Sequence, residues 1–505
     1  APKVFYYSKD LSTNLLLNSN NIGDPPLSRR DFYRFGGGFN NLNARTGTSI
    51  NITSDDAGIT ELQNNRAKSI DAQFGAYNFS YSPTESLEFS GFAIYSRAEN
   101  HLEEKNTRTY NVSNEVEETS EFSVQDTEQE LYKFSAEFNP NETLQTEYNL
   151  LYKTSSQEEV SDLTTISTRN GLRVPEQIVQ LRQQTPFSLN QELRFYYTHR
   201  ENHIFSFELQ HLAQQEDPFY RAIKQFQPFG RVLDLNQDQE NFNINQDRNV
   251  KTDKVEGKLD YYFILSPKSN FNLTLGVTDV RQDFDSSIFQ ILDNNTTENF
   301  NENNLINRVN FRFQDAYTAL HYRFIKGIFT FDPGVTLHYY KTTTDQLNGI
   351  VSDSYSFFRP DFRVLMKLKE SETLRLIFRS TRQFTDINNL AEGFIFRNYN
   401  SFFRGNPNLE AAFFNVVNLN YQSINIFNFT NIFANLSYSR RDNAIQNTTA
   451  VQGINSVRSA TNSDFPRYTY TASARIDKRF KNFKGGLNIN FNYSDFNNVI
   501  NDNPT

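Results

Sequence analysis

A strict alternation of apolar and polar residues over 258–278, KLDYYFILSPKSNFNLTLGVT, limits what this chain can fold into more than any other feature. The apolar positions before and after the central SPKSN segment all have odd numbers: Leu259, Tyr261, Phe263, Leu265, Phe271, Leu273, Leu275 and Val277. A period of two places each set on one face of an extended strand, and the proline-containing interruption is typical of a tight reversal. The stretch therefore predicts a β-hairpin with one apolar and one polar face.

The same hairpin recurs along nearly the whole chain. Similar alternation surrounds a short turn in residues 77–95, 132–152, 187–209, 316–339, 362–378 and 468–493, with weaker pairs near 4–18, 42–52 and 414–441. The pattern predicts about 18 strands of about 9–12 residues each. Such strands exceed the usual length of about 5–6 residues in globular proteins and match the length that crosses a bilayer when tilted.

The connections between these strands fall into two classes. Short turns at 82–86, 139–143, 266–270 and 369–372 alternate with long polar stretches near 98–129, 154–186, 213–252, 281–309, 382–413 and 442–465. Outer-membrane barrels sort their connections in this way, with short periplasmic turns and long extracellular loops. The alternative is a large water-soluble β-protein with one wet face.

The residue types on the two faces fit a lipid exterior and a polar lumen. Lys258, Asp260 and Asn272 lie on the parity opposite to the apolar residues of the first hairpin. Tyrosines near predicted strand ends would form interfacial girdles: Tyr81, Tyr95, Tyr197, Tyr339 and Tyr493. The sequence thus predicts an all-β fold, a transmembrane antiparallel barrel in the outer membrane.

Composition excludes several other classes of protein. A hydrophobic content of 37% and a mean hydropathy of −0.65 argue against a helical membrane protein. There is no cysteine, so disulfides and thiolate chemistry are excluded. The net charge is −9 with no dense basic run, so we expect no nucleic-acid partner.

Few residues are candidates for a chemical site. The six histidines (101, 199, 203, 211, 321 and 338) include the pair His199 and His203, which flank a turn and lack an HExxH context. Asp234, Asn236, Asp238 and Glu240 resemble the start of a calcium loop, but the glycine and distal glutamate of an EF-hand are missing. We expect hydrated loops there and in the acidic stretch 114–130.

No catalytic constellation stands out either. Gly405, Asn406 and Pro407 predict a turn that leads into a strand. No nucleophile triad, paired catalytic carboxylates or phosphate loop is recognisable. We therefore expect a protein that is not an enzyme, with no catalytic, cofactor-binding or metal-binding residues, and the substrate-binding residues stay unknown.

Two stretches resemble a known family. Residues 374–423, LRLIFRSTRQFTDINNLAEGFIFRNYNSFFRGNPNLEAAFFNVVNLNYQS, contain a strand ending in a Ser/Thr-Arg run, an INNL element and GNPNLEA before the next strand. In this order they resemble the C-terminal half of TonB-dependent outer-membrane receptors, most closely the Bacteroidota branch. Residues 15–38, LLLNSNNIGDPPLSRRDFYRFGGG, look like a segment that these proteins carry early in the barrel.

The resemblance implies a 22-stranded barrel filled by a plug, with a Ton box that engages TonB–ExbB–ExbD to import a metal chelate, glycan or peptide. With about 18 strands visible of a probable 22, we expect residues 1–505 to be one incomplete barrel domain. Its plug, Ton box and closing strands are not seen in the sequence. The alternative function is a non-transporting barrel scaffold in a surface-protein export or assembly complex. A surface lipoprotein partner is compatible with both functions, and a soluble adhesin built from long hairpins is a third possibility.

Overall fold

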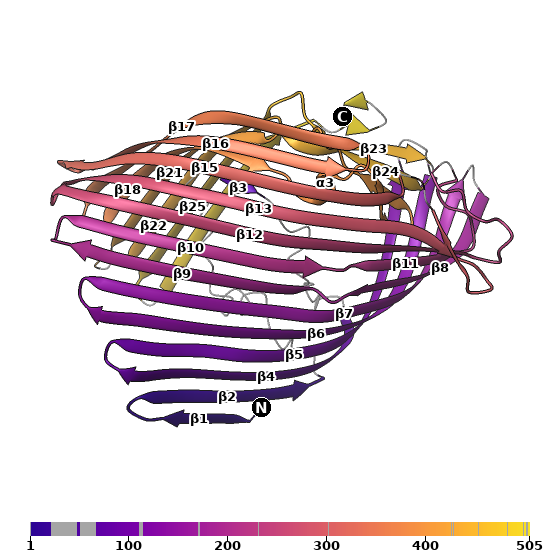
Figure 1. Cartoon of the computed structure of the whole chain (residues 1–505), viewed down its shortest axis with the longest axis horizontal. Helices are drawn as coiled ribbons and strands as arrows, with labels where there is room; N and C mark the ends of the chain where they lie inside the picture. The colour runs from indigo at the N-terminus through magenta and orange to yellow at the C-terminus, as the bar shows by residue number, and fades with distance from the viewer. Residues whose placement is uncertain are drawn as a thin grey trace.

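The computed structural model describes residues 2–21, 48–50, 67–110, 115–169, 172–230, 232–300, 302, 304–425, 427, 429–452, 454–481, 483–497, 499–500 and 503–504. Long antiparallel strands lie side by side in one curved wall, with short turns at one end and longer connections at the other (Figure 1). We call these the turn end and the loop end. The predicted sorting of connections is therefore confirmed.

Within the described residues the wall consists of 18 strands, and consecutive strands of this series pair with each other. In order they are β1 (Lys3–Tyr7), β2 (Leu11–Asn20), β4 (Ala67–Thr84), β5 (Leu87–Tyr110), β6 (Glu115–Asn141), β7 (Leu144–Arg169), β9 (Phe187–His199), β10 (His203–Glu216), β12 (Phe242–Ser266), β13 (Ser269–Ile291), β15 (Ile306–Lys326), β16 (Phe329–Gln346), β17 (Gly349–Lys369), β18 (Glu372–Phe384), β21 (Ala412–Asn425), β22 (Thr430–Asp442), β25 (Arg467–Phe480) and β26 (Phe483–Asp495). The predicted number of strands is confirmed.

In the described part of the chain four further strands enlarge this sheet to 22 strands without adding to the number that run from end to end. They are β3 (Thr48–Ile50), β8 (Leu172–Gln184), β11 (Phe219–Lys224) and β14 (Thr297–Asn299). Within the described residues, β1 pairs only with β2 and β26 only with β25. A closed barrel of 22 crossing strands therefore stays a prediction.

The apolar face of the alternation points outward, as predicted. On β13, Leu275 is 46% exposed whereas its neighbour Thr274 is 6% exposed. On β16 the outward apolar positions extend from Phe329 to Tyr339, a stretch of 11 residues. At about 3.3 Å per residue and a tilt of about 40°, this length spans about 25–28 Å, the height of a bilayer's apolar layer. We call this outward region the membrane band.

Beyond the membrane band the same strands continue, and their pattern inverts. On β13 the outward positions after Val277 are Asp279, Arg281 and Asp283, whereas the inward Val280 and Phe284 are fully buried. The polar stretches predicted as loops at 98–129, 154–186 and 281–309 are therefore largely strand, and the predicted strand length of about 9–12 residues is wrong. β6 has 27 residues and β12 has 25. Outside the bilayer the outer face of the strands contacts water and the inner face contacts a packed interior. Polar residues therefore occupy the outward positions there, and apolar residues occupy the inward positions.

Tyrosines mark both limits of the membrane band. Tyr95, Tyr339 and Tyr493 lie on its loop-end side, whereas Tyr81 and Tyr197 lie next to the turns. On the loop-end side the ring of Tyr470 lies 5.1 Å from that of Tyr438 and 6.1 Å from that of Tyr493. These two rows have the arrangement of interfacial aromatic girdles.

Two prolines interrupt neighbouring strands just above the band. Pro186 separates β8 from β9, and Pro218 separates β10 from β11. Proline has no N–H to donate to the ladder. The carboxylate of Asp217 instead accepts the backbone N–H of Thr185 at 2.6 Å. The loop-end halves β8 and β11 pair with each other and complete the wall there.

A second, smaller sheet lies at the loop end. It contains β19 (Phe394–Asn398), β20 (Ser401–Arg404), β23 (Ile445–Gln452), β24 (Asn455–Asn462), β27 (Val499–Ile500) and β28 (Asn503–Pro504). The hairpin predicted near 42–52 is not part of the wall as described, because β3 runs parallel to β18; the remainder of that stretch lies outside the described residues. No helix in the described residues is long and apolar enough to cross a membrane.

Candidate functional site

The INNL and GNPN elements of the sequence lie in one compact segment inside the loop end. We call residues 385–411 the inner module; it holds α3 (Ile387–Leu390), β19 and β20. Asp386 caps α3 by accepting the backbone N–H groups of Asn388 at 2.9 Å and Asn389 at 3.2 Å. Burial raises the pKa of the Asp386 carboxyl, and these backbone hydrogen bonds oppose the rise.

Gly405 joins the two ends of the inner module. Its N–H donates to the carbonyl oxygen of Ala391 at 2.8 Å, and the N–H of Asn406 donates to that of Asn389 at 2.7 Å. A Cβ at position 405 would lie 2.5 Å from the Asn389 carbonyl oxygen, so the close approach requires glycine. The predicted turn at Gly405, Asn406 and Pro407 is confirmed, and its contacts are structural.

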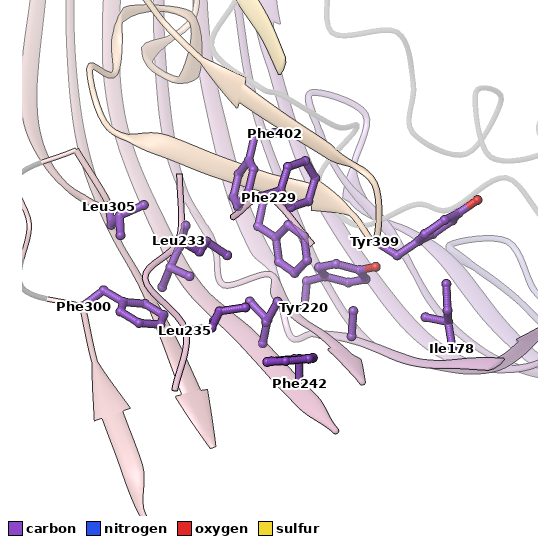
Figure 2. Packing of buried hydrophobic residues seen from close by; sticks show 14 of the residues in the cluster. Ile178, Tyr220, Phe229, Leu233, Leu235, Phe242, Phe300, Leu305, Tyr399 and Phe402 are labelled. Carbon is purple, nitrogen blue, oxygen red and sulfur yellow. The ribbon is translucent and has the colours of Figure 1, made fainter. Parts of the chain in front are cut away.

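Aromatic side chains fasten the inner module to the inner face of the wall. Phe402 is fully buried, and its ring lies 4.4 Å from that of Phe229 and 5.1 Å from that of Phe396 (Figure 2). Tyr220 on β11 extends the cluster, with its ring 5.0 Å from that of Phe396. A second cluster joins Phe384 and Ile395 to the inward residues of β13 and β15. The inverted part of the strand pattern is therefore the packing surface for this module.

A buried polar cluster lies beside the tip of the inner module. Glu117 on β6 has no exposed surface and accepts the hydroxyl protons of Tyr110 and Tyr399, each at 2.8 Å. Burial, with a contribution from Glu117, raises the pKa of Tyr110 to about 12, although Arg108 opposes the rise. Burial and the Glu117 carboxylate likewise raise the pKa of Tyr399.

Lys224 completes this cluster. Its ammonium donates to the carbonyl oxygen of Tyr399 at 3.3 Å and lies 3.6 Å from the carboxylate of Glu176. Burial lowers the pKa of Lys224, and Glu176 opposes the change. These side chains connect β6, β8 and β11 with the inner module, so they hold its tip against the wall.

A second buried polar group lies at the upper limit of the band. His338 Nδ1 lies 2.9 Å from Asp315 Oδ1, and the hydroxyl of Thr48 donates to Asp315 Oδ2 at 2.8 Å. Thr48 also lies 2.8 Å from the Tyr340 hydroxyl. This network attaches the interior strand β3 to β15 and β16.

Near the turn end, inward side chains surround a cavity of about 520 Å³. Its charged lining consists of Arg323, Arg359, Arg363, Arg379, Asp332, Asp361 and the imidazole of His321. We call it the arginine pocket. Arg363 lies 2.9 Å from Asp332, and Asp361 lies 3.1 Å from His321 Nε2 and 3.4 Å from Arg359.

A glycine positions the histidine of this pocket. In the sheet register, His321 on β15 lies opposite Gly334 on β16, which in turn lies opposite Asp361 on β17. A Cβ at position 334 would overlap the His321 imidazole. The absence of a side chain there lets the imidazole cross one strand and reach the carboxylate on the next.

The positions singled out in the sequence are dispersed. His199 and His203 lie at the turn between β9 and β10, where His203 stacks on Phe263 with ring centroids 5.1 Å apart. Residues 234–241 lie between β11 and β12; the N–H of Asn236 donates to Gln290 Oε1 at 2.9 Å and that of Glu240 to Asp293 Oδ2 at 2.8 Å. Residues 242–247 are the first residues of β12, where Asn245 and Gln246 are fully buried, so the predicted hydrated loop is wrong for this part. In the part of the chain that the structure describes, no three or more His, Asp or Glu side chains gather closely enough to hold a metal ion.

The acidic stretch 114–130 is a strand and not the hydrated loop that its composition indicates. From residue 115 onward it forms the loop-end half of β6. Glu117 points inward into the polar cluster because it has inward parity on that strand. The sequence signal that marks Glu117 as an inward residue is the alternation across the acidic run. The acidic composition of the run as a whole does not show this.

A wall of membrane-height strands with an apolar band, two tyrosine girdles and a polar interior defines an outer-membrane β-barrel protein. The outer membrane protein beta-barrel family matches residues 198–505, more than half of the chain. The chain belongs to this family. Its predicted localisation and fold class are thereby confirmed, as is its resemblance to receptor barrels of the outer membrane; a Bacteroidota origin stays a prediction.

Solved structures agree with this fold. The chain is similar to the copper transporter OprC, with 12% identity, a TM-score of 0.51, and 84% of this chain and 59% of that chain covered. It is also similar to the outer membrane transporter YddB from Escherichia coli, with 11% identity, a TM-score of 0.50, and 97% and 60% covered. The chain thus spans about three-fifths of the length of these structures. No curated protein matches the sequence.

Proposed function

We propose that this chain is the barrel of a TonB-dependent receptor that imports a small nutrient across the outer membrane, and that it is not an enzyme. The observation that carries the proposal is a polar inner face that runs through a membrane-height wall, from the arginine pocket at the turn end to the inner module at the loop end. A purely structural anchor needs an apolar exterior but has no need of charged side chains along its lumen.

The inward charges are arranged along the wall and not at one point. Lys254 and Lys258 on β12 are each 8% exposed, and Lys258 lies 3.1 Å from Asp260 and 3.4 Å from Glu208. Burying charges is costly unless they are paired. Their pairing gives a hydrophilic lining whose stability does not depend on a cargo, which suits a passage for polar solutes.

In this proposal the two ends have different tasks. The loop end, with the inner module and its aromatic clusters, would face the outside and receive the nutrient. The turn end would face the periplasm, where TonB–ExbB–ExbD supplies energy in the proposed mechanism. A surface lipoprotein partner that covers the loops is part of the same proposal.

The test is uptake by cells that lack the gene, with the wild-type gene restored as the positive control. Labelled metal chelates, oligosaccharides and peptides are supplied with and without a protonophore. We expect the deletion strain to lose uptake of one of these compound classes. In the complemented strain, uptake of that class should return and should stop when the protonophore is added. Unchanged uptake of every class, together with loss of particular proteins from the cell surface, would replace import by the scaffold function.

A further inference from the structure

We infer that the arginine pocket is a binding site for a small polyanion that carries carboxylate or phosphate groups. The pocket lies near the turn end and far from the inner module along the strands; its charged lining comes from β15–β18, and β10, β12 and β13 supply the rest of its lining. The assignment deepens the proposed function, and its role in passage rests on that function. Binding itself can be measured independently.

The charge balance of the pocket favours an anion. Its lining holds four arginines and two aspartates, which leaves a formal charge of +2 with His321 neutral. The chain as a whole carries −9. The positive charge of the pocket therefore comes from the placement of its arginines and not from the overall composition of the chain. Low-dielectric walls around such a pocket focus its field toward the lumen.

The pairing of these arginines divides them into two groups. Arg359 and Arg363 are held by carboxylates, and Arg359 Nη1 also donates to the carbonyl oxygen of Ser380 at 2.6 Å. Arg323 and Arg379 line the same cavity and are exposed to it, but within the described residues neither forms an ion pair with a carboxylate. Arg323 on β15 and Arg379 on β18 are thus the two guanidinium groups that are available to a ligand.

The fixed group gives the site its shape. Arg359 is 2% exposed, and Asp361 is held between it and His321. Gly334 leaves the space in which the His321 imidazole lies next to β16. The floor of the pocket is therefore constrained by contacts among β15, β16 and β17, whereas the two guanidinium groups without a carboxylate partner come from β15 and β18.

The size and chemistry of the site limit the ligand class. A cavity of about 520 Å³ lies within the range of small-molecule sites. Guanidinium groups bind carboxylates and phosphates through two parallel N–H···O bonds, and binding by arginine is favoured where planar recognition matters. Two such groups match an anion with at least two acidic functions better than a monovalent ion.

The experiment is isothermal titration calorimetry of the purified chain in detergent micelles at low salt, with sodium citrate and inorganic pyrophosphate as probes. The two probes distinguish a carboxylate from a phosphate preference. The variants are Arg323→Gln, Arg379→Gln and the double variant, and the control is Arg97→Gln. Arg97 lies on the outward face above the membrane band, paired with Asp126 at 2.7 Å. Heat-modifiable gel migration confirms that each variant is folded.

We expect one saturable site in the wild type for at least one probe. Each single variant should weaken binding about tenfold or more, since a hydrogen-bonded charged partner is lost, and the control should bind as the wild type does. Undiminished binding by the double variant, equal weakening by the control, or no binding of either probe to the wild type would overturn the assignment. Uptake without probe binding would refute the anion site and support import. Probe binding without uptake would support the anion site and refute import.

Discussion

Substitution of Leu275 by arginine tests the position of the membrane band most directly. Leu275 points outward on β13, is 46% exposed, and lies between the apolar Leu273 and Val277 on the same face. Its partners across the sheet are Leu259 on β12 and Thr318 on β15. An arginine here would place its charge in the apolar layer of the bilayer.

The size of the effect follows from depth in the membrane. Arginine on the lipid face of a barrel costs about 2–4 kcal/mol at the midplane and about 0–1 kcal/mol near the interfaces. Asp283 shares the strand and the outward parity of Leu275, eight residues further toward the loop end, which is about 27 Å along the strand. We therefore expect Leu275→Arg to lower the free energy of unfolding by about 2–4 kcal/mol and Asp283→Arg to change it by less than about 1 kcal/mol.

The assay is guanidinium unfolding of the chain in phospholipid vesicles, followed by the shift between folded and unfolded migration on gels. Two further variants examine the inner face. Asn272→Arg points into the lumen and should cost less than Leu275→Arg. Phe284→Ala lies beyond the band but is fully buried, so it should cost about 3–5 kcal/mol. Equal losses for Leu275→Arg and Asp283→Arg, or a negligible loss for Phe284→Ala, would refute the inverted pattern.

Three other perturbations examine the interior. Phe402→Ala should free the inner module by removing about 3–5 kcal/mol of packing, and faster hydrogen exchange confined to 385–411 would show it; unaltered exchange there would contradict the aromatic anchoring. Gly334→Val should displace the His321 imidazole at a cost of about 1–3 kcal/mol, and an unchanged histidine NMR signal would exclude the proposed crossing. Burial raises the pKa of Tyr110 to about 12 from its usual value near 10, so its folded-state contribution is present below about pH 10 and is lost as the pH rises toward 12. Proteolysis of the inner module should accelerate across that window, and no acceleration would show that the cluster with Glu117 does not hold the tip.

The strand pattern shows where sequence reasoning succeeded and where it failed. The hairpin at 258–278 has the register that its alternation predicts, with Phe263 opposite Phe271 and Leu259 opposite Leu275. The continuation of β13 through 279–291 was missed because its apolar residues change parity after Val277. An alternation rule that assumes a single environment interprets this change as the end of a strand, whereas the strand only leaves the membrane.

Spacing within one segment does not show where polar side chains gather in the structure. Motif spacing drew attention to His199, His203 and the segment 234–247, where residues are close in sequence. The groups that gather in the structure come from distant segments: Glu117 and Tyr399 are 282 positions apart, and Asp315 and Thr48 are 267 apart. Separations of this size carry no local pattern, so spacing within one segment cannot reveal them.

The sequence by itself determined the all-β class, the number of crossing strands and the outward direction of the apolar face. These properties are local, since the period of two and the turn residues act within a single hairpin. Only the tertiary structure decided that the loop-end extensions are strands packed against an inner module, and that Arg323 and Arg379 share one cavity with His321. Curvature of the sheet brings these side chains together, because inward residues of different strands converge on one lumen, and no single strand encodes that convergence.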